Sequence, residues 1–315
     1  MKHFKWDKGP VPMSRFANLD NVDTIKSFSD LRRWQKERRQ KKKDLSIKIK
    51  QAPVKEIDKL KKNQTQASVT WIGHSTFLIQ MNGLNMLTDP VWASRMGLGK
   101  RLTEPGISLN DLPEIDVVLL SHGHYDHLDF PTIKKLKGNP TYYVPIGLGS
   151  AFKKRGYQKV IESNWDDSFE QNGLTFTFVP AQHWTRRTLT DTNTSHWGGW
   201  IIENQEHSIY FVGDTGYFRG FQEIAQKFTI QTVLMPIGAY EPEWFMKLSH
   251  INPEDAVKAF LELEGKTFIP MHYGTYHLAD DTGPEAISRL DAEWSRLQLD
   301  ATQLKKLLIG ETMWL

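Results

Sequence analysis

Three histidines and an aspartate crowd into six consecutive residues, and this cluster constrains the chain more than any other feature. It reads His122-Gly123-His124-Tyr125-Asp126-His127. The apolar run 117–120 directly before it predicts a buried strand. Active sites of α/β proteins favour the carboxyl ends of strands, where a loop can direct several side chains to one point. We therefore expect a functional site at this edge of a sheet.

The composition restricts the chemistry of such a site. The chain has no cysteine, which excludes disulfides, thiol nucleophiles, iron–sulfur clusters and cysteine-bound zinc. Any metal must be held by His, Asp or Glu, a ligand set that suits Zn²⁺ or a neighbouring divalent metal. His122, His124, Asp126 and His127 are close enough to serve two adjacent ions. Two ions would need more ligands than this loop supplies.

Three further candidate ligands each follow a predicted strand. They are His183, Asp214 and His272. Any one histidine alone is more often a structural residue with satisfied hydrogen bonds. The dense motif and three strand-end residues together favour a metal centre, because packing rarely requires such spacing.

Short β-rich runs bounded by turns begin at Ala67 and predict a sheet-based domain. Strands are predicted at 69–72, 76–81, 85–87, 117–120, 175–179, 199–202, 208–212, 233–236 and 268–271. Helices are predicted at 129–137, with Asp129 as its cap, at 256–264 after the Asn252-Pro253 turn, and at 284–297. Strand groups separated by helices predict two sheets packed face to face and covered outside by helices.

The segment before this domain is polar and basic. We expect residues 1–66 to be an N-terminal extension and residues 67–315 to form the catalytic domain. Residues 31–62 carry 14 Lys and Arg against 4 Asp and Glu in a chain of net charge +3. Such a stretch is usually a solvated helix face or an arm packed on the domain. The alternative is contact with an anionic surface, either lipid headgroups or nucleic acid.

Several stretches of the sequence resemble a known family. The His-x-His-x-Asp-His cluster is similar to the signature of the metallo-β-lactamase superfamily. Within it, the chain resembles the N-acylphosphatidylethanolamine-hydrolysing phospholipase D branch. That resemblance lies in 71–76, 87–90, 183–187, 211–217 and 236–247. It implies an α/β fold, the αββα sandwich of two mixed β-sheets flanked by helices.

The resemblance also implies roles for particular residues. One Zn²⁺ would be held by His122, His124 and His183, the other by Asp126, His127 and His272, with Asp214 bridging them. Another divalent transition metal is an alternative. His250 is implied to act near the reacting group, although a histidine before a capped helix can also be a simple turn residue. Asp126 or His250 would be the general acid.

Four other residues have two interpretations each. His74 and Asp89 follow predicted strands and are expected to hydrogen-bond to ligands rather than bind metal themselves. Arg186 and Arg187 are either surface charges or the groups that bind a substrate phosphate.

The expected activity is hydrolysis of a phosphodiester by a hydroxide that bridges two zinc ions. The branch implies a phospholipase D-type cut of N-acylphosphatidylethanolamine-like lipids. The alternatives are a lactonase of the ascorbate-phosphate lactonase type, a nuclease, and a metal-stabilised module that binds membrane or nucleic acid without turnover. We do not expect nucleic acid as a partner, and the oligomeric state is open.

Two sequence observations bear on location. No apolar run reaches the roughly 20 residues of a transmembrane helix. Residues 1–10 lack the apolar region of a secretory signal. We expect a cytoplasmic protein, with peripheral contact to the inner face of a membrane through residues 31–62.

Overall fold

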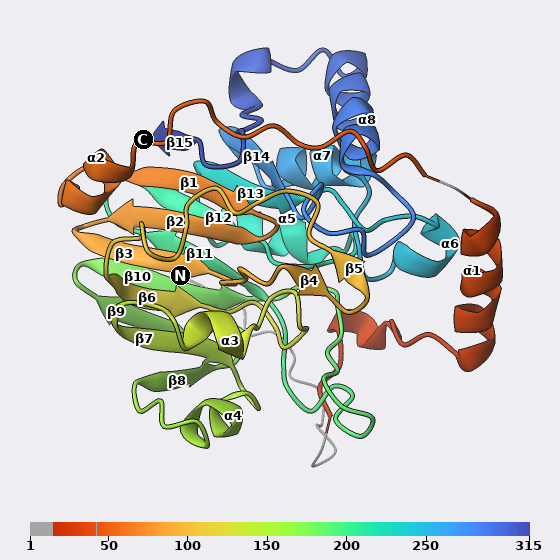
Figure 1. Ribbon diagram of the computed structural model, residues 1–315, viewed down its shortest axis with the longest axis horizontal. Helices are drawn as coiled ribbons and strands as arrows, with labels where there is room; N and C mark the ends of the chain where they lie inside the picture. The colour runs from red at the N-terminus through yellow and green to blue at the C-terminus, as the bar shows by residue number, and fades with distance from the viewer. Residues whose placement is uncertain (1–14, 42) are drawn as a thin grey trace.

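Two mixed β-sheets pack face to face in the computed structural model, which describes residues 15–41 and 43–315 (Figure 1). The first sheet has seven strands in the order β15-β1-β2-β3-β6-β7-β8. Their bounds are β1 Ser68–Gly73, β2 Thr76–Met81, β3 Leu84–Thr88, β6 Ile115–Leu119, β7 Gly138–Pro145, β8 Val160–Ser163 and β15 Thr312–Trp314. β15, β1, β2 and β3 pair antiparallel, whereas β3, β6, β7 and β8 are parallel.

The second sheet has six strands in the order β14-β13-β12-β11-β10-β9. Their bounds are β9 Ser168–Gln171, β10 Leu174–Val179, β11 Gly199–Glu203, β12 Ser208–Phe211, β13 Thr232–Pro236 and β14 Thr267–Met271. β12, β13 and β14 are parallel and the others antiparallel. A small hairpin, β4 Arg95–Met96 and β5 Gly99–Lys100, stands apart from both sheets.

Side chains of β6 alternate between two apolar layers, as the period of two along a strand requires. Val117 and Leu119 join the core cluster shared with the second sheet. Val118 belongs to the outer cluster, which is covered by three short helices. These are α2 Ile57–Lys62, α3 Phe130–Ile133 and α4 Gly149–Lys153. These helices pack apolar side chains into the outer cluster, for example Leu60 of α2 and Phe152 of α4.

The second sheet is covered by helices from the later part of the chain. α7 Pro253–Glu262 contacts β13, α5 Gly220–Ala225 and α8 Gly283–Arg296. The remaining elements are η1 Leu19–Asn21, α1 Phe28–Gln40, α6 Glu243–Met246 and η2 Ala301–Gln303. Helices therefore lie on both sides of the paired sheets, which confirms the predicted αββα sandwich.

All nine predicted strands are present, but the predicted helix over 129–137 is wrong beyond its first turn. Asp129 does cap α3, yet the helix ends at Ile133. The carbonyl of Lys137 accepts a hydrogen bond from the Ile115 N–H at 3.0 Å, and β7 begins at the next residue, Gly138. Parallel pairing of β7 with β6 thus removes these residues from the helix.

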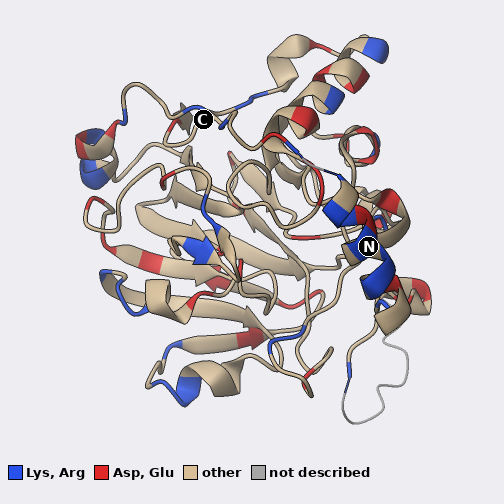
Figure 2. Ribbon diagram, turned by 45° about the vertical axis from the view of Figure 1, so that its right-hand side comes forward, with Lys and Arg blue, Asp and Glu red and all other residues tan. Residues whose placement is uncertain are grey.

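The basic stretch 31–62 does not form one patch. Its two helices, α1 and α2, lie at opposite edges of the molecule (Figures 1 and 2). The Trp34 ring of α1 stacks on Phe245 with centroids 4.9 Å apart, and Leu60 of α2 is 1% exposed. These apolar side chains therefore pack on the protein itself rather than forming an outward apolar face. Over the described residues, no helix is both long and apolar enough to span a bilayer.

Candidate metal centre

The candidate ligands gather where strands of both sheets end. The cluster from His122 to His127 follows β6 of the first sheet. His183, Asp214 and His272 follow β10, β12 and β14 of the second sheet. Side chains up to 150 residues apart in sequence are thereby brought to one edge of the sandwich, as the strand-end argument predicted.

Three imidazoles converge in a first group. His124 Nδ1 lies 2.9 Å from His122 Nε2 and 3.1 Å from His183 Nε2. Tetrahedral zinc with bonds of about 2.0–2.1 Å places its nitrogen ligands about 3.3 Å apart, which is close to these separations. The three nitrogens can therefore hold one ion.

A second group lies beside the first. His127 Nε2 is 3.3 Å from Asp126 Oδ2 and 3.3 Å from His272 Nε2. His74 Nε2 approaches the same Asp126 oxygen at 3.0 Å. All four residues can reach a single ion, so the geometry allows His74 either to brace Asp126, as expected from the sequence, or to bind metal.

Asp214 lies between the two groups. Its Oδ2 is 3.2 Å from His127 Nε2 and 3.9 Å from His183 Nε2. Its Oδ1 is buried and has no hydrogen-bond partner among the described residues. A buried carboxylate oxygen without a donor is costly unless a cation satisfies it. This placement fits the bridging role implied by the family resemblance.

The groups differ in their electrostatics. Burial holds the pKa of His122 and of His183 well below the usual value, and lowers the pKa of His124 to about 4. These imidazoles are neutral and able to donate lone pairs to a metal. Burial also opposes charge on His127, but the carboxylates of Asp214 and Asp126 outweigh it and hold the His127 pKa well above its usual value.

Asp89 orients two of the candidate ligands, as its position after β3 suggested. Its Oδ2 accepts from His127 Nδ1 at 2.6 Å and from Ser121 Oγ at 2.5 Å. Ser121 Oγ in turn accepts from His122 Nδ1 at 2.9 Å. Ligating histidines commonly donate their second nitrogen to such a carboxylate or hydroxyl, which fixes the ring and its tautomer. Ser121 was not assigned from the sequence, although it immediately precedes the motif.

Backbone strain marks the same region. His74, Asp89 and His272 have φ values of 56°, 33° and 62°. Residues other than glycine seldom adopt this left-handed conformation, and the surrounding structure must compensate for its cost. The strain is concentrated at the strand ends that aim these side chains into the centre.

His250 lies at the exposed side of the cluster. Its Nδ1 is 3.8 Å from Asp214 Oδ2, and its side chain keeps 17% exposure. The N–H of Ile251 donates to the Thr215 carbonyl at 2.7 Å, which ties this turn to the loop that carries Asp214. His250 therefore lies near any group bound at the centre, and it is also close enough to join His183 and Asp214 around an ion.

The two arginines have different surroundings. Arg187 Nη1 donates to the carbonyls of Gly123 and Leu128 at 2.8 and 3.0 Å, so it supports the loop that holds the ligands. Arg186 is exposed. The guanidinium of Arg186 lies 5.8 Å from the Trp184 ring. Of the two, Arg186 remains the better candidate for phosphate binding.

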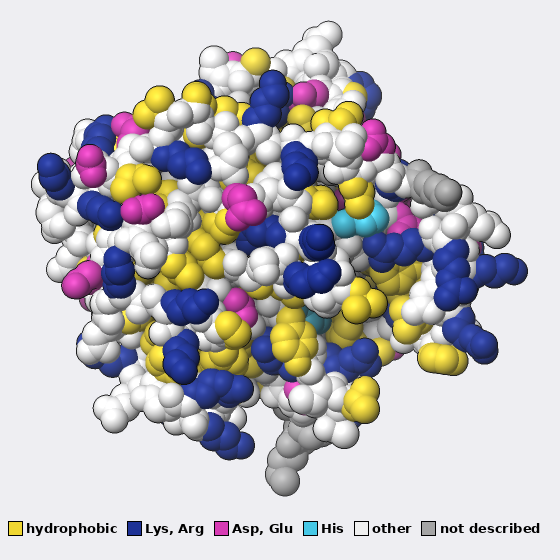
Figure 3. Space-filling model, in the orientation of Figure 1, with side chains coloured by type: hydrophobic (Ala, Val, Ile, Leu, Met, Phe, Trp, Pro, Cys, Tyr) yellow, Lys and Arg dark blue, Asp and Glu magenta, His cyan; other side chains and the backbone are white. Residues whose placement is uncertain are grey.

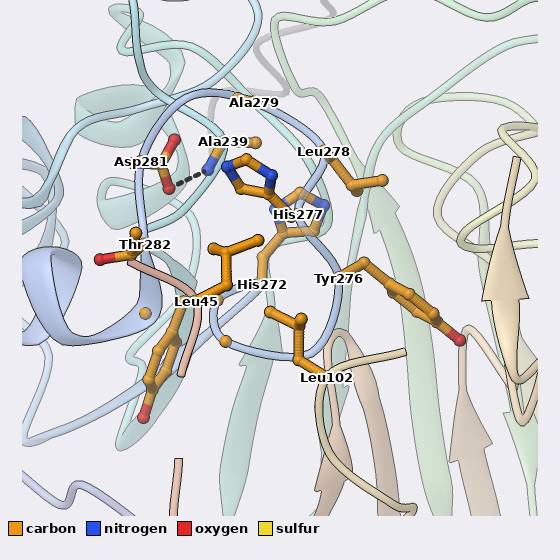
Figure 4. Close-up of a pocket in the computed structure, with 13 residues that line it drawn as sticks. Leu45, Leu102, Ala239, His272, Tyr276, His277, Leu278, Ala279, Asp281 and Thr282 are labelled. Carbon is orange, nitrogen blue, oxygen red and sulfur yellow. Dashed lines mark hydrogen bonds between the residues drawn. The ribbon is translucent and has the colours of Figure 1, made fainter. Parts of the chain in front are cut away.

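A small cavity lies behind His272 (Figure 4). Asp281 lines it and accepts a hydrogen bond from the Ala239 N–H at 3.0 Å. Its volume of about 10 Å³ has room for one water molecule at most. The cavity is therefore too small for a substrate. The partly exposed members of the cluster are His124, Asp126 and His250.

Comparison with known proteins agrees with this site. A family model described as a beta-lactamase superfamily domain matches residues 84–273, more than half of the chain. The chain belongs to the metallo-β-lactamase superfamily. An archaeal member from Methanopyrus kandleri, named as a metal-dependent hydrolase, is 32% identical over 212 residues, 66% of this chain and 84% of that protein. A relative with that name fits the two ligand groups of this site.

Two further likenesses are to a lipid-hydrolysing relative and to a solved structure. The N-acyl-phosphatidylethanolamine-hydrolyzing phospholipase D 1 of Caenorhabditis elegans is 40% identical over 226 residues, 66% of this chain. The alignment spans 64% of that relative's length, less than two thirds. The solved structure of Igni18, a metallo hydrolase from Ignicoccus hospitalis, has a TM-score of 0.61 at 21% identity and covers 80% of this chain and 99% of its own. At that identity the structural likeness supports the fold alone.

Proposed function

We propose that the protein is a phosphodiesterase of phospholipase D type that acts on N-acylphosphatidylethanolamine-like lipids with two Zn²⁺ or similar ions. The observation that carries this proposal is the pair of ligand groups with Asp214 between them. Two-metal sites of this kind serve displacements at phosphorus. The likeness to the C. elegans phospholipase D supports the lipid substrate.

In this proposal the side chains of the protein hold the two ions and transfer the proton to the leaving oxygen. His122, His124 and His183 would hold one ion, and Asp126, His127 and His272 the other. Ions so held lower the pKa of a bound water and neutralise charge that develops on phosphate oxygens. Water attacks phosphorus, the bond to the ethanolamide oxygen breaks, and that oxygen takes a proton. His250 or Asp126, at the exposed side, would take the proton that the attacking water releases and deliver it to that oxygen.

An apolar groove supports a substrate with acyl chains. It has a volume of about 690 Å³ and includes Leu98, Leu102 and Leu278, with Arg38 and Lys100 among its charged residues. It borders the segment that follows the candidate ligand His272. Acyl chains fit such walls, and the cations suit the negative charge of a phospholipid headgroup.

The face with this groove also suits contact with a membrane surface. Leu98, at the tip of the β4–β5 hairpin, is 99% exposed. Lys and Arg side chains predominate over acidic ones around the hairpin and along the outer side of α1 (Figure 3). Each such cation contributes about 1 kcal/mol near an anionic bilayer, so a few suffice for reversible docking. We therefore assign the peripheral membrane contact to α1 rather than to the whole of 31–62.

The experiment that tests this function supplies N-acylphosphatidylethanolamine in phosphatidylcholine vesicles and identifies the products by mass spectrometry. The proposal predicts phosphatidic acid and free N-acylethanolamine, with metal-stripped protein as the inactive control. Metal-dependent turnover of a lactone or of DNA, without turnover of this lipid, would contradict the proposal and identify the protein as a lactonase or a nuclease. Metal binding without turnover of the lipid, a lactone or DNA would indicate a binding module rather than an enzyme.

A further inference from the structure

One side chain from the N-terminal segment holds both backbone polar groups of a candidate ligand. Asn18 Oδ1 accepts from the His183 N–H at 2.9 Å, and Asn18 Nδ2 donates to the His183 carbonyl at 2.9 Å. Thr24 Oγ1 donates to the same carbonyl at 3.1 Å. Asn18 and Thr24 are 7% and 2% exposed. Hydrogen bonds so deeply buried are expensive to break, because each broken bond leaves a polar group without water.

The backbone of His183 depends on these contacts because regular structure does not hold it. β10 ends at Val179 and β11 begins at Gly199, and the residues between them form neither helix nor strand. The His183 ring is fixed separately, since its Nδ1 donates to the Ser249 carbonyl at 2.9 Å. Asn18 therefore fixes the position of the His183 backbone, and the Ser249 carbonyl fixes the orientation of the His183 ring.

Other contacts of the same segment reach the far end of this loop. The Phe16 N–H donates to the Asn193 carbonyl at 2.8 Å, and the Phe16 ring stacks on His196 with centroids 4.5 Å apart. Trp197 Nε1 donates to Asn18 Oδ1 at 2.9 Å. Residues 16–24 thus run along the loop from His183 to Trp197 and fasten it at both ends.

We infer that residues 16–24 form a strap that completes the metal centre, with Asn18 as a positioning residue for His183. The inference rests on the metal centre of the proposed function and is independent of the substrate. His183 belongs to the group with His122 and His124, so a loosened strap should weaken that site alone. The group of Asp126, His127 and His272 is held by other loops.

The test measures metal binding without substrate. Co²⁺ is titrated into metal-free full-length protein in competition with a chelator, and the visible spectrum of each bound ion is recorded. Asn18→Ala should weaken one of the two sites by about 10–100-fold, the usual effect of removing a group that positions a ligand. Asn18→Asp keeps the acceptor for the His183 N–H but places a buried carboxylate oxygen against the His183 carbonyl, so it should weaken the same site at least as much as Asn18→Ala.

Two further variants separate positioning from folding. Thr24→Val removes the second bond to the His183 carbonyl and a longer one, 3.4 Å, that Thr24 Oγ1 accepts from Asn18 Nδ2, and it should weaken the same site slightly. Asn204→Ala is the matched control, because Asn204 also bonds two backbone N–H groups, those of Glu206 and His207, in a turn without ligands. It should leave both sites unchanged. Equal weakening of both sites in all three strap variants, or unchanged binding in Asn18→Ala, would overturn the inference.

Discussion

Asp89 and His127 form a buried pair in which the His127 Nδ1–H donates to Asp89 Oδ2 at 2.6 Å, and both side chains are inaccessible to solvent. The same carboxylate accepts the Ser121 N–H at 2.8 Å. One aspartate outside the ligand groups thus fixes the backbone before the motif and the ring at its end. The geometry of the motif from His122 to His127 therefore depends on Asp89 as well as on the spacing of its own residues.

Replacing Asp89 with Asn should therefore weaken metal binding more than it lowers the stability of the fold. The amide retains the shape but cannot accept all three hydrogen bonds, because one of its two ends is a donor. We expect metal affinity to fall by about 10–100-fold. Chelator competition measures the affinity, and a melting curve of the metal-free protein measures the fold. A lower melting temperature with unchanged metal affinity would make Asp89 a structural residue only.

Asp214→Ala should damage activity far more than folding. The change removes the carboxylate between the two ligand groups, and a bridging ligand sets the spacing of two ions more than it supports the core. In the metal-free protein it removes a buried oxygen without a described donor, but also the carboxylate that faces His127 Nε2 at 3.2 Å, so the melting temperature should fall, though by less than the activity does. Turnover of bis(p-nitrophenyl) phosphate is compared with melting temperature. Equal, modest losses in both would argue against the bridging role.

The sequence predicted the sandwich, and it predicted that the candidate ligands would lie together, because both leave local signals. Apolar strands followed by His or Asp identify strand ends without knowledge of the fold. β7 was missed because it begins with Gly138-Asn139-Pro140, residues that usually mark turns, and only pairing with β6 makes it a strand. The shorter strands β8, β9 and β15 have three or four residues each, too few to show a clear period.

The support of the centre was harder to predict than the centre itself. Asn18 lies 165 residues before His183, and nothing near Asn18 in the sequence indicates a metal site. Ser249 contributes a backbone carbonyl, which any residue type supplies. The capping box that starts α1, Ser27 with Asp30, was not assigned from the sequence, and neither was the packing of that helix against Phe245. Such partners are chosen by tertiary packing.

His250→Ala should lower kcat while the metal content stays intact. His250 lies at the exposed side of the cluster, where it can reach a leaving group, and a lost general acid typically costs about 10²–10⁴-fold in rate. Metal content is measured on the same preparation. A loss of metal together with activity would instead make His250 a ligand, which its distance of 3.8 Å from Asp214 allows.

Charge reversal on α1 should impair hydrolysis only at a membrane. Lys36→Glu with Arg39→Glu alters the exposed side of α1, and Lys61→Glu with Lys62→Glu makes the same change in net charge on α2 at the opposite edge. We expect the α1 variant to lose activity on anionic vesicles and to keep it on a soluble diester. Raised salt should mimic the loss, because it screens exposed charges. Equal effects of the two variants on vesicles would contradict docking through α1.

The most direct test of the whole account is a titration of metal-free protein with Zn²⁺ while hydrolysis of bis(p-nitrophenyl) phosphate is followed. The account predicts no hydrolysis at the start and a rise that reaches its plateau at about two ions per chain, as expected of two-metal hydrolases. His122→Ala combined with His272→Ala should abolish the response by disabling both ligand groups. Full activity in a preparation shown to be free of metal would contradict the central claim.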